Sequence, residues 1–102
     1  MSVIMGLRVT ADPDRVQQAL TSDPERLKRI AQRARDGGCI HHRFYANEAG
    51  SAVLVVDEWP DVDSFMRFFE SSHDIGEMMA EGGVTERPTP EFWHELDTPD
   101  KF

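Results

Sequence analysis

The stretch in which an apolar strand ends at a proline and a helix begins constrains this chain most. Residues 52–56, AVLVV, form an unbroken run of strand-forming side chains, which is typical of a strand buried on both faces. Trp59 marks the exit of the strand, and Pro60 and Asp61 then supply a first-turn proline and a cap for a helix. The stretch therefore predicts a sheet that is covered on both sides.

The helix that begins here is expected to be amphipathic. Its apolar residues recur at intervals of three and four positions, at Val62, Phe65, Met66 and Phe69. Because this spacing places the side chains on one stripe of a helix, we expect that stripe to face the sheet.

The other elements follow from hydrophobic period and from helix-capping signals. Alternating side chains predict a strand near the N-terminus, and two Asp-Pro pairs, at Asp12 and Asp23, predict a first helix that is broken into two parts. Ser71 and Asp74 have the spacing of a capping box and predict a further short helix. The expected elements are a strand over 3–10, a broken helix over 12–37, strands over 39–45 and 52–56, a helix over 61–69, a short helix over 71–82 and a strand over 91–96.

The charge balance and the cysteine content exclude several classes of function. Eleven Lys and Arg against 19 Asp and Glu give a formal net charge of −8, which repels nucleic-acid backbones and anionic membrane surfaces. No apolar run approaches the roughly 20 residues of a membrane span. Cys39 is the only cysteine, so an internal disulfide and a thiolate zinc cluster are both excluded. We expect a cytoplasmic protein that binds neither nucleic acid nor membrane.

The length predicts one domain over 1–102, with a polar tail over 97–102 that is either flexible or wrapped against a neighbour. Two short helices can cover only one face of a sheet in a chain of this size. Because the strand over 52–56 requires cover on both faces, we expect a homodimer in which a second copy covers the other face.

Adjacent histidines in the second predicted strand must have different surroundings. Successive side chains of a strand point to opposite faces, so His41 and His42 cannot bind one metal ion together. His42 shares a face with Ile40 and Phe44, which indicates the covered side. A hydrogen-bonded structural histidine and a catalytic base both remain open for this position. His73, four residues before Glu77, fits surface pairing better than metal binding, because no third ligand lies at a suitable spacing.

The order strand, helix, strand, strand, helix, strand is that of a ferredoxin-like α+β sandwich (βαββαβ) with an antiparallel sheet. Over nearly its whole length the chain resembles the dimeric α/β-barrel superfamily, specifically the antibiotic biosynthesis monooxygenase-like (ABM) domains. The resemblance rests on Gly38-Cys39, on LVVDEWPDVDSFMRFF over 54–69 and on GGV over 82–84 followed by prolines. It implies that two sheets pack face to face and that the chain dimerises as an α/β barrel.

The resemblance also implies a class of activity. The superfamily includes cofactor-independent oxygenases of aromatic polyketides and quinols, haem-degrading enzymes and members with no known reaction. The catalytic asparagine of the haem degraders has no counterpart in residues 1–10. We therefore expect a monooxygenase-like protein that needs no cofactor and acts on a small aromatic or quinol-type compound. The alternative is a non-catalytic dimeric small-molecule-binding or accessory protein of the same fold.

Such a reaction requires a dry aromatic pocket with one or two polar groups. We expect this pocket between the sheet and its helices, near Trp59, with His42 and Trp59 as catalytic candidates and His41 or His73 as other possible bases. Trp59 matches a tryptophan that is typical of the family, and a packing anchor is its other interpretation. The expected ligand-binding residues are Phe44, Tyr45, Phe65, Phe68, His73 and Trp93.

Overall fold

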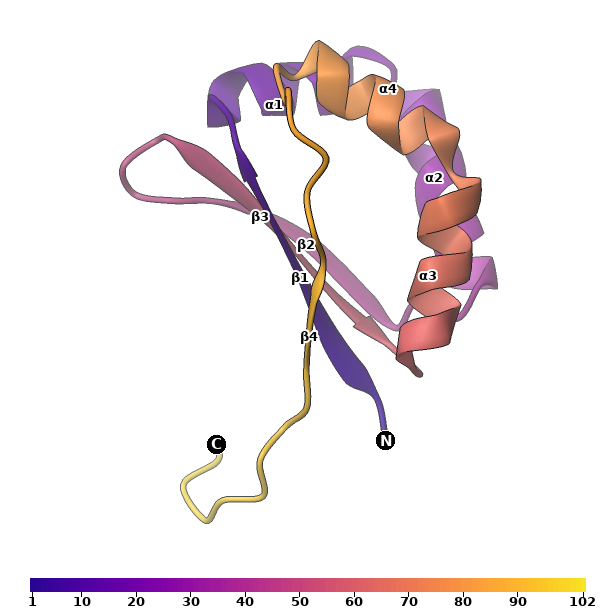
Figure 1. Cartoon of the computed structure of the whole chain (residues 1–102), viewed down its shortest axis with the longest axis vertical. Helices are drawn as coiled ribbons and strands as arrows, with labels where there is room; N and C mark the ends of the chain where they lie inside the picture. Colours follow the sequence, from indigo (N-terminus) through magenta and orange to yellow (C-terminus); the bar gives the residue numbers. More distant parts are fainter.

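A four-stranded antiparallel sheet forms one layer of this protein, and four helices form the other. The computed structural model describes all of residues 1–102, and Figure 1 shows the helices together on one side of the sheet. The strand order is β2-β3-β1-β4. The elements are β1 (Val3–Thr10), α1 (Pro13–Ser22), α2 (Pro24–Asp36), β2 (His41–Ala46), β3 (Ala52–Trp59), α3 (Val62–Ser71), α4 (His73–Glu81) and β4 (Glu91–Trp93). The expected ferredoxin-like α+β sandwich is confirmed.

The two interior strands build the floor of the core. In β1 every second residue is buried, from Val3 to Val9, and the residues between them face the other side. β3 pairs with β1 over its full length, with Leu7 opposite Val55 and Met5 opposite Asp57. Because register partners in a sheet share a face, Asp57 points toward the helices, among apolar neighbours.

The opposite face of the sheet is uncovered within one chain. Leu54 is 40% exposed, Tyr45 52% and Trp93 57%, and Ile4 lies on the same face. The helices cover only one face of residues 52–56, as expected for a chain of this size, because every helix packs on the same side (Figure 1).

The first helical segment is broken as predicted. Asp12 and Asp23 each accept a backbone hydrogen bond as the cap of α1 and α2, and a proline occupies the first turn of both. The predicted break therefore divides this segment into two helices, α1 and α2, instead of one continuous helix.

The buried side of α3 agrees with the predicted stripe except at its first residue. Asp61 caps the helix as expected, and Phe65, Met66 and Phe69 pack in or against the core, while Val62 lies at the surface. Phe68, which the stripe did not include, is also buried, and the rings of Phe65 and Phe68 both pack on Trp59.

The cap of α4 is also one residue away from its predicted position. Ser72 occupies the N-cap, and no capping box forms at Ser71. The Ser72 hydroxyl instead donates to the carbonyl of Phe68 and accepts from Arg33, which forms an ion pair with Asp74. The Asp74 carboxylate therefore joins α2 to α4 and is not available to complete a cap.

The last strand is shorter than the predicted strand over 91–96. β4 contains three residues and pairs with Ile4–Gly6 of β1. β1 begins at Val3, so almost no partner remains for the residues after Trp93. The following residues run past the end of the sheet (Figure 1), and in the exposed tail Lys101 pairs with Glu95 and Asp97. None of the four helices has the length and hydrophobicity that a membrane-spanning helix requires.

Candidate functional site

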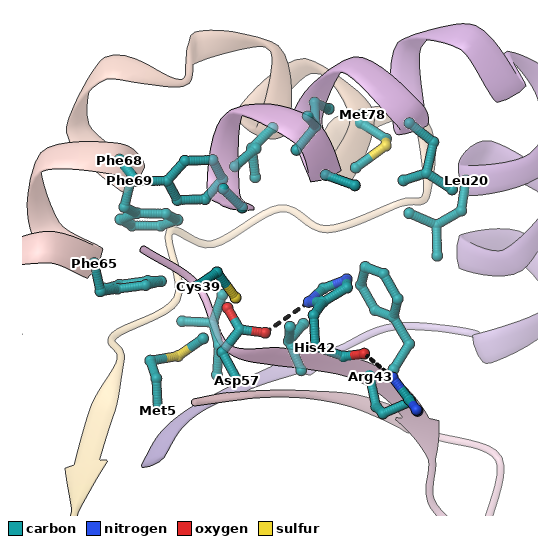
Figure 2. Close-up of a pocket in the computed structure, with 18 of the residues that line it drawn as sticks. Met5, Leu20, Cys39, His42, Arg43, Asp57, Phe65, Phe68, Phe69 and Met78 are labelled. Atoms are coloured by element: carbon teal, nitrogen blue, oxygen red, sulfur yellow. Dashed lines mark hydrogen bonds and ion pairs between the residues drawn. The ribbon is translucent and has the colours of Figure 1, made fainter. Parts of the chain in front are cut away.

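A large cavity separates the sheet from its helices. Its volume is about 690 Å³, and most of the residues that line it are apolar. The helix-facing side chains of the sheet form the floor of the cavity. The apolar faces of the four helices form its roof, with Leu20 from α1, Ile30 from α2, Phe65 from α3 and Met78 from α4. Figure 2 shows Leu20, Phe65 and Met78 above the side chains of the sheet. An interior of this kind fits a flat apolar ligand.

His42 is the histidine that faces the helices in this cavity. It lies on β2, opposite Asp57 of β3 in the register, and its Nδ1 lies 2.6 Å from Asp57 Oδ1. Its ring packs edge-on against Phe44, with ring centroids 4.8 Å apart. Figure 2 shows the imidazole standing above the sheet, on the side of the helices.

The Asp57 carboxylate is the hydrogen-bond partner of this histidine. Only 5% of Asp57 is exposed, and its second oxygen, Oδ2, accepts a hydrogen bond of 3.0 Å from Nε1 of Trp59. An ionised carboxylate can only accept hydrogen bonds. When Asp57 is ionised and His42 is neutral, Nδ1 is the donor to Asp57 and the lone pair of the ring lies at Nε2. This tautomer presents a base to the cavity.

Trp59 does not line the cavity. It is fully buried, with Phe65 and Phe68 at ring-centroid distances of 5.6 and 5.3 Å, and it lies outside the set of lining residues. The expectation of a pocket that contains Trp59 itself is thus corrected: the two phenylalanines form the wall, and the indole lies behind them. Trp59 reaches the site only through its hydrogen bond to Asp57.

The structure separates the other predicted site residues into two groups. Phe44, Phe65 and Phe68 line the cavity together with His42. Tyr45 and Trp93 lie on the uncovered face of the sheet, because alternation along β2 and β4 turns them away from the helices. His73 is exposed at the start of α4 and is not a lining residue. His41 is paired with Glu58 in the register and belongs to the uncovered face, although the edge strand borders the cavity at this position.

Sequence reasoning did not identify Asp57 as the partner of His42. The signal was present, because Asp57 and Trp59 are two residues apart and must share a face of the strand. The register of the hairpin of β2 and β3 places Asp57 opposite His42. In the turn of this hairpin, Asn47 Oδ1 accepts hydrogen bonds from the backbone of Ser51 and Ala52.

Cys39 lines the same cavity next to Asp57 (Figure 2). Its burial, together with the negative charge of Asp57, raises the pKa of the thiol to about 11. Because a thiolate is the nucleophilic form of cysteine, this thiol is a poor nucleophile at neutral pH. No group of three His, Cys, Asp or Glu side chains has the arrangement of a metal site.

No family model and no curated protein matches this chain. Solved structures do match it. SnoaB, a cofactor-independent oxygenase from Streptomyces nogalater, is 14% identical with a TM-score of 0.65, and the match covers 98% of each chain. The ActVA-Orf6 monooxygenase of Streptomyces coelicolor, solved with nanaomycin D, is 14% identical with a TM-score of 0.69, and the match covers 95% of this chain and 88% of that one.

A dimeric ferredoxin-like protein from an uncultured marine organism is 11% identical with a TM-score of 0.68, and the match covers 99% of this chain and 93% of the other. At these identities the likeness concerns the fold. The resemblance expected from the sequence is confirmed at that level: this chain has the ferredoxin-like fold of the antibiotic biosynthesis monooxygenase-like proteins.

Proposed function

We propose that this protein is a cofactor-independent monooxygenase of small aromatic phenols, quinols or anthrones, with His42 as its general base. The observation that carries the proposal is the pair of His42 and Asp57 at the floor of a large apolar cavity. The likeness in fold to two oxygenases supports it.

The proposed reaction needs one proton acceptor and molecular oxygen. His42 Nε2 takes the acidic proton of the bound substrate, and Asp57 stabilises the imidazolium that forms. The electron-rich anion then reacts with O₂ at carbon. For an anthrone, the CH₂ group becomes C=O, one oxygen atom stays in the product and the other leaves as water with both hydrogens. The apolar walls keep water away from the anion during this step.

A non-catalytic small-molecule-binding protein is the second candidate. The burial of Trp59 favours it, because the indole cannot contact a ligand and His42 is left as the main polar group of the floor. A binder needs the same apolar walls but no free base, so the two candidates differ in the role of His42.

The proposal includes a homodimer that forms over the uncovered face of the sheet. Leu54, Tyr45 and Trp93 expose apolar surface there, and such a surface is usually buried in an assembly. One structural neighbour of this fold is a dimer. The cavity lies on the other side of the sheet, so each chain would keep its own site.

Oxygen uptake with a panel of anthrones and hydroquinones tests the function. The His42→Gln variant should lose about 10²- to 10⁴-fold in turnover, the usual effect of losing a general base. His94→Gln is the matched control, because His94 is exposed and does not line the cavity. Unchanged uptake in a folded His42→Gln dimer would exclude His42 as the base. If the parent binds these compounds but oxidises none of them, the binding protein is the better account.

A further inference from the structure

The charges that border the cavity have the opposite sign to the protein as a whole. The chain has a formal net charge of −8, but the Lys and Arg residues that line the cavity are Lys28, Arg35 and Arg43, and the only acid among the lining residues is Asp57. Asp57 already has two hydrogen-bond partners, His42 and Trp59. Three cations against one carboxylate leave the lining with a net positive charge.

Two of these cations lie along one side of α2. Lys28 and Arg35 are seven residues apart, with Ala31 between them on the same side of the helix, and all three are exposed residues that line the cavity. At 1.5 Å per residue, their backbone positions are about 10 Å apart along the helix. The strand that borders the cavity opposite them, β2, is an edge strand. The exposed residues among those that line the cavity all lie in α2, at Ile40 or in β2, so we place the mouth of the cavity between α2 and β2, at the two cations.

The other cations of α2 have different surroundings. Arg26 forms an ion pair with Glu81, and Arg33 forms one with Asp74, so both connect α2 to α4. Lys28 has only a loose, exposed pair with Glu25 at 3.6 Å. Arg35 forms no ion pair. A free guanidinium at the mouth of an apolar cavity can bind a carboxylate through two parallel hydrogen bonds.

From this arrangement we infer that the ligand is an aromatic compound that carries a carboxylate, with its ring system in the cavity and the carboxylate at Arg35 and Lys28. The inference names the substrate class of the proposed oxygenase and rests on the proposed function for the reaction, but not for binding. Arg43 has a lesser part, because its guanidinium bends back to donate to the carbonyl of His42 at 2.7 Å (Figure 2).

Binding of two probes that differ only in charge tests the inference without turnover. Calorimetry compares 2-naphthoate with 2-naphthamide, which has almost the same shape and no charge. The parent should bind the carboxylate about 5- to 10-fold more tightly at low salt, as for a charge-assisted hydrogen bond that is partly exposed. The preference should shrink as salt is added, since the site is open to solvent.

Variants assign the preference to residues. Arg35→Gln should abolish most of it, and the addition of Lys28→Gln should remove the rest. Arg29→Gln is the matched control, because Arg29 is an exposed cation of the same helix that does not line the cavity, and its loss changes the net charge equally. Equal binding of both probes, binding of neither, or a preference that survives the double variant would each overturn the inference.

Two substrates that differ only in charge, together with the Arg35 variant, separate this inference from the proposed oxygenase. Oxygen uptake is compared for an anthrone with a carboxylate on one outer ring and for the carboxamide of the same compound. Oxidation of both to the anthraquinone at equal kcat/KM would retain the oxygenase and overturn the carboxylate preference. A preference for 2-naphthoate that depends on Arg35, without oxidation of any anthrone, would retain the ligand class and overturn the oxygenase.

Discussion

Trp59 and Asp57 lie two residues apart on the same face of β3, and the indole Nε1 donates to Asp57 Oδ2 at 3.0 Å. The indole is fully buried against Phe65 and Phe68, and the carboxylate accepts from His42 with its other oxygen. The packing anchor of the core therefore orients the acid that in turn orients the cavity histidine. This chain of contacts makes Trp59 a positioning residue in the proposed reaction.

Replacing Asp57 by Asn should affect the reaction more than the fold. One of the two N–H donors, from Trp59 or His42, would then face an amide NH₂, and His42 would be free to take the tautomer with Nε2 protonated. We expect oxygen uptake to fall about 10²- to 10⁴-fold and the free energy of unfolding to fall by about 1–3 kcal/mol. Glu58→Gln, on the opposite face, is the control. Activity within twofold of the parent in folded Asp57→Asn would show that the carboxylate does not support the base.

Alkylation of Cys39 should report the electrostatics of the site. With a pKa of about 11, the rate of reaction with iodoacetamide should rise about tenfold per pH unit from pH 7 to 9 without levelling off, because only the thiolate reacts. In denaturant the rate should level off near the ordinary pKa of cysteine, about 8.5. Asp57→Asn removes a nearby negative charge and should speed the reaction of the folded protein. A plateau below pH 9 in the native protein would contradict the assigned burial of the thiol.

The ion pair of Arg33 and Asp74 should make stability depend on acid pH. The hydrogen bonds from Arg33 lower the pKa of Asp74 from its ordinary value of 3.8, so the pair stabilises the folded state above that value and ceases to do so as the pH falls through the lower, folded-state pKa. Arg33→Gln should cost about 0.5–1.5 kcal/mol at pH 7, a value reduced for partial exposure of both side chains.

Chemical denaturation at a series of pH values measures this difference. The gap between parent and Arg33→Gln should be constant near neutral pH and shrink below about pH 4, close to the ordinary pKa of aspartate. Arg29→Gln, on the same helix, is the matched control, because Arg29 is exposed and its loss leaves the pair of Arg33 and Asp74 intact. A gap that stays the same down to pH 2 would assign the effect to packing and not to Asp74.

A charge on the uncovered face of the sheet should break the proposed homodimer. Sedimentation of the parent at micromolar concentration should show two chains. Leu54→Lys should sediment as one chain, since it places a charge in an apolar interface and, by symmetry, in both copies. Gln18→Lys, on the exposed surface of α1, controls for the added charge. A parent that is a stable monomer, or a Leu54→Lys protein that is still a dimer, would rule out this face as the interface.

Local rules of the backbone were sufficient to predict most of the fold. The alternation along residues 3–10 predicted β1, the Asp-Pro pairs separated α1 from α2, and Asp61 capped α3, because period and capping depend only on neighbours in the chain. The same alternation along β2 correctly predicted that His42 and Phe44 face the helices.

The positions that depend on packing between elements could not be predicted in this way. The sequence suggested that Trp59 contacts the ligand, but Phe65 and Phe68 cover it, and only the distance between sheet and helices decides which aromatic is the wall and which is the anchor. Tyr45 and Trp93 have the composition of pocket residues but lie on the other face of the sheet.

The sequence by itself therefore determined the order of the elements and the caps of α1, α2 and α3. Only the tertiary structure brought Asp57 to His42, because the register of a hairpin joins residues that are 15 positions apart in the chain. It also left Arg35 unpaired at the mouth of the cavity while Arg33, two residues earlier on the same helix, paired with α4. The two arginines carry the same charge in the sequence, and the fold alone decides which of them meets a carboxylate within the protein.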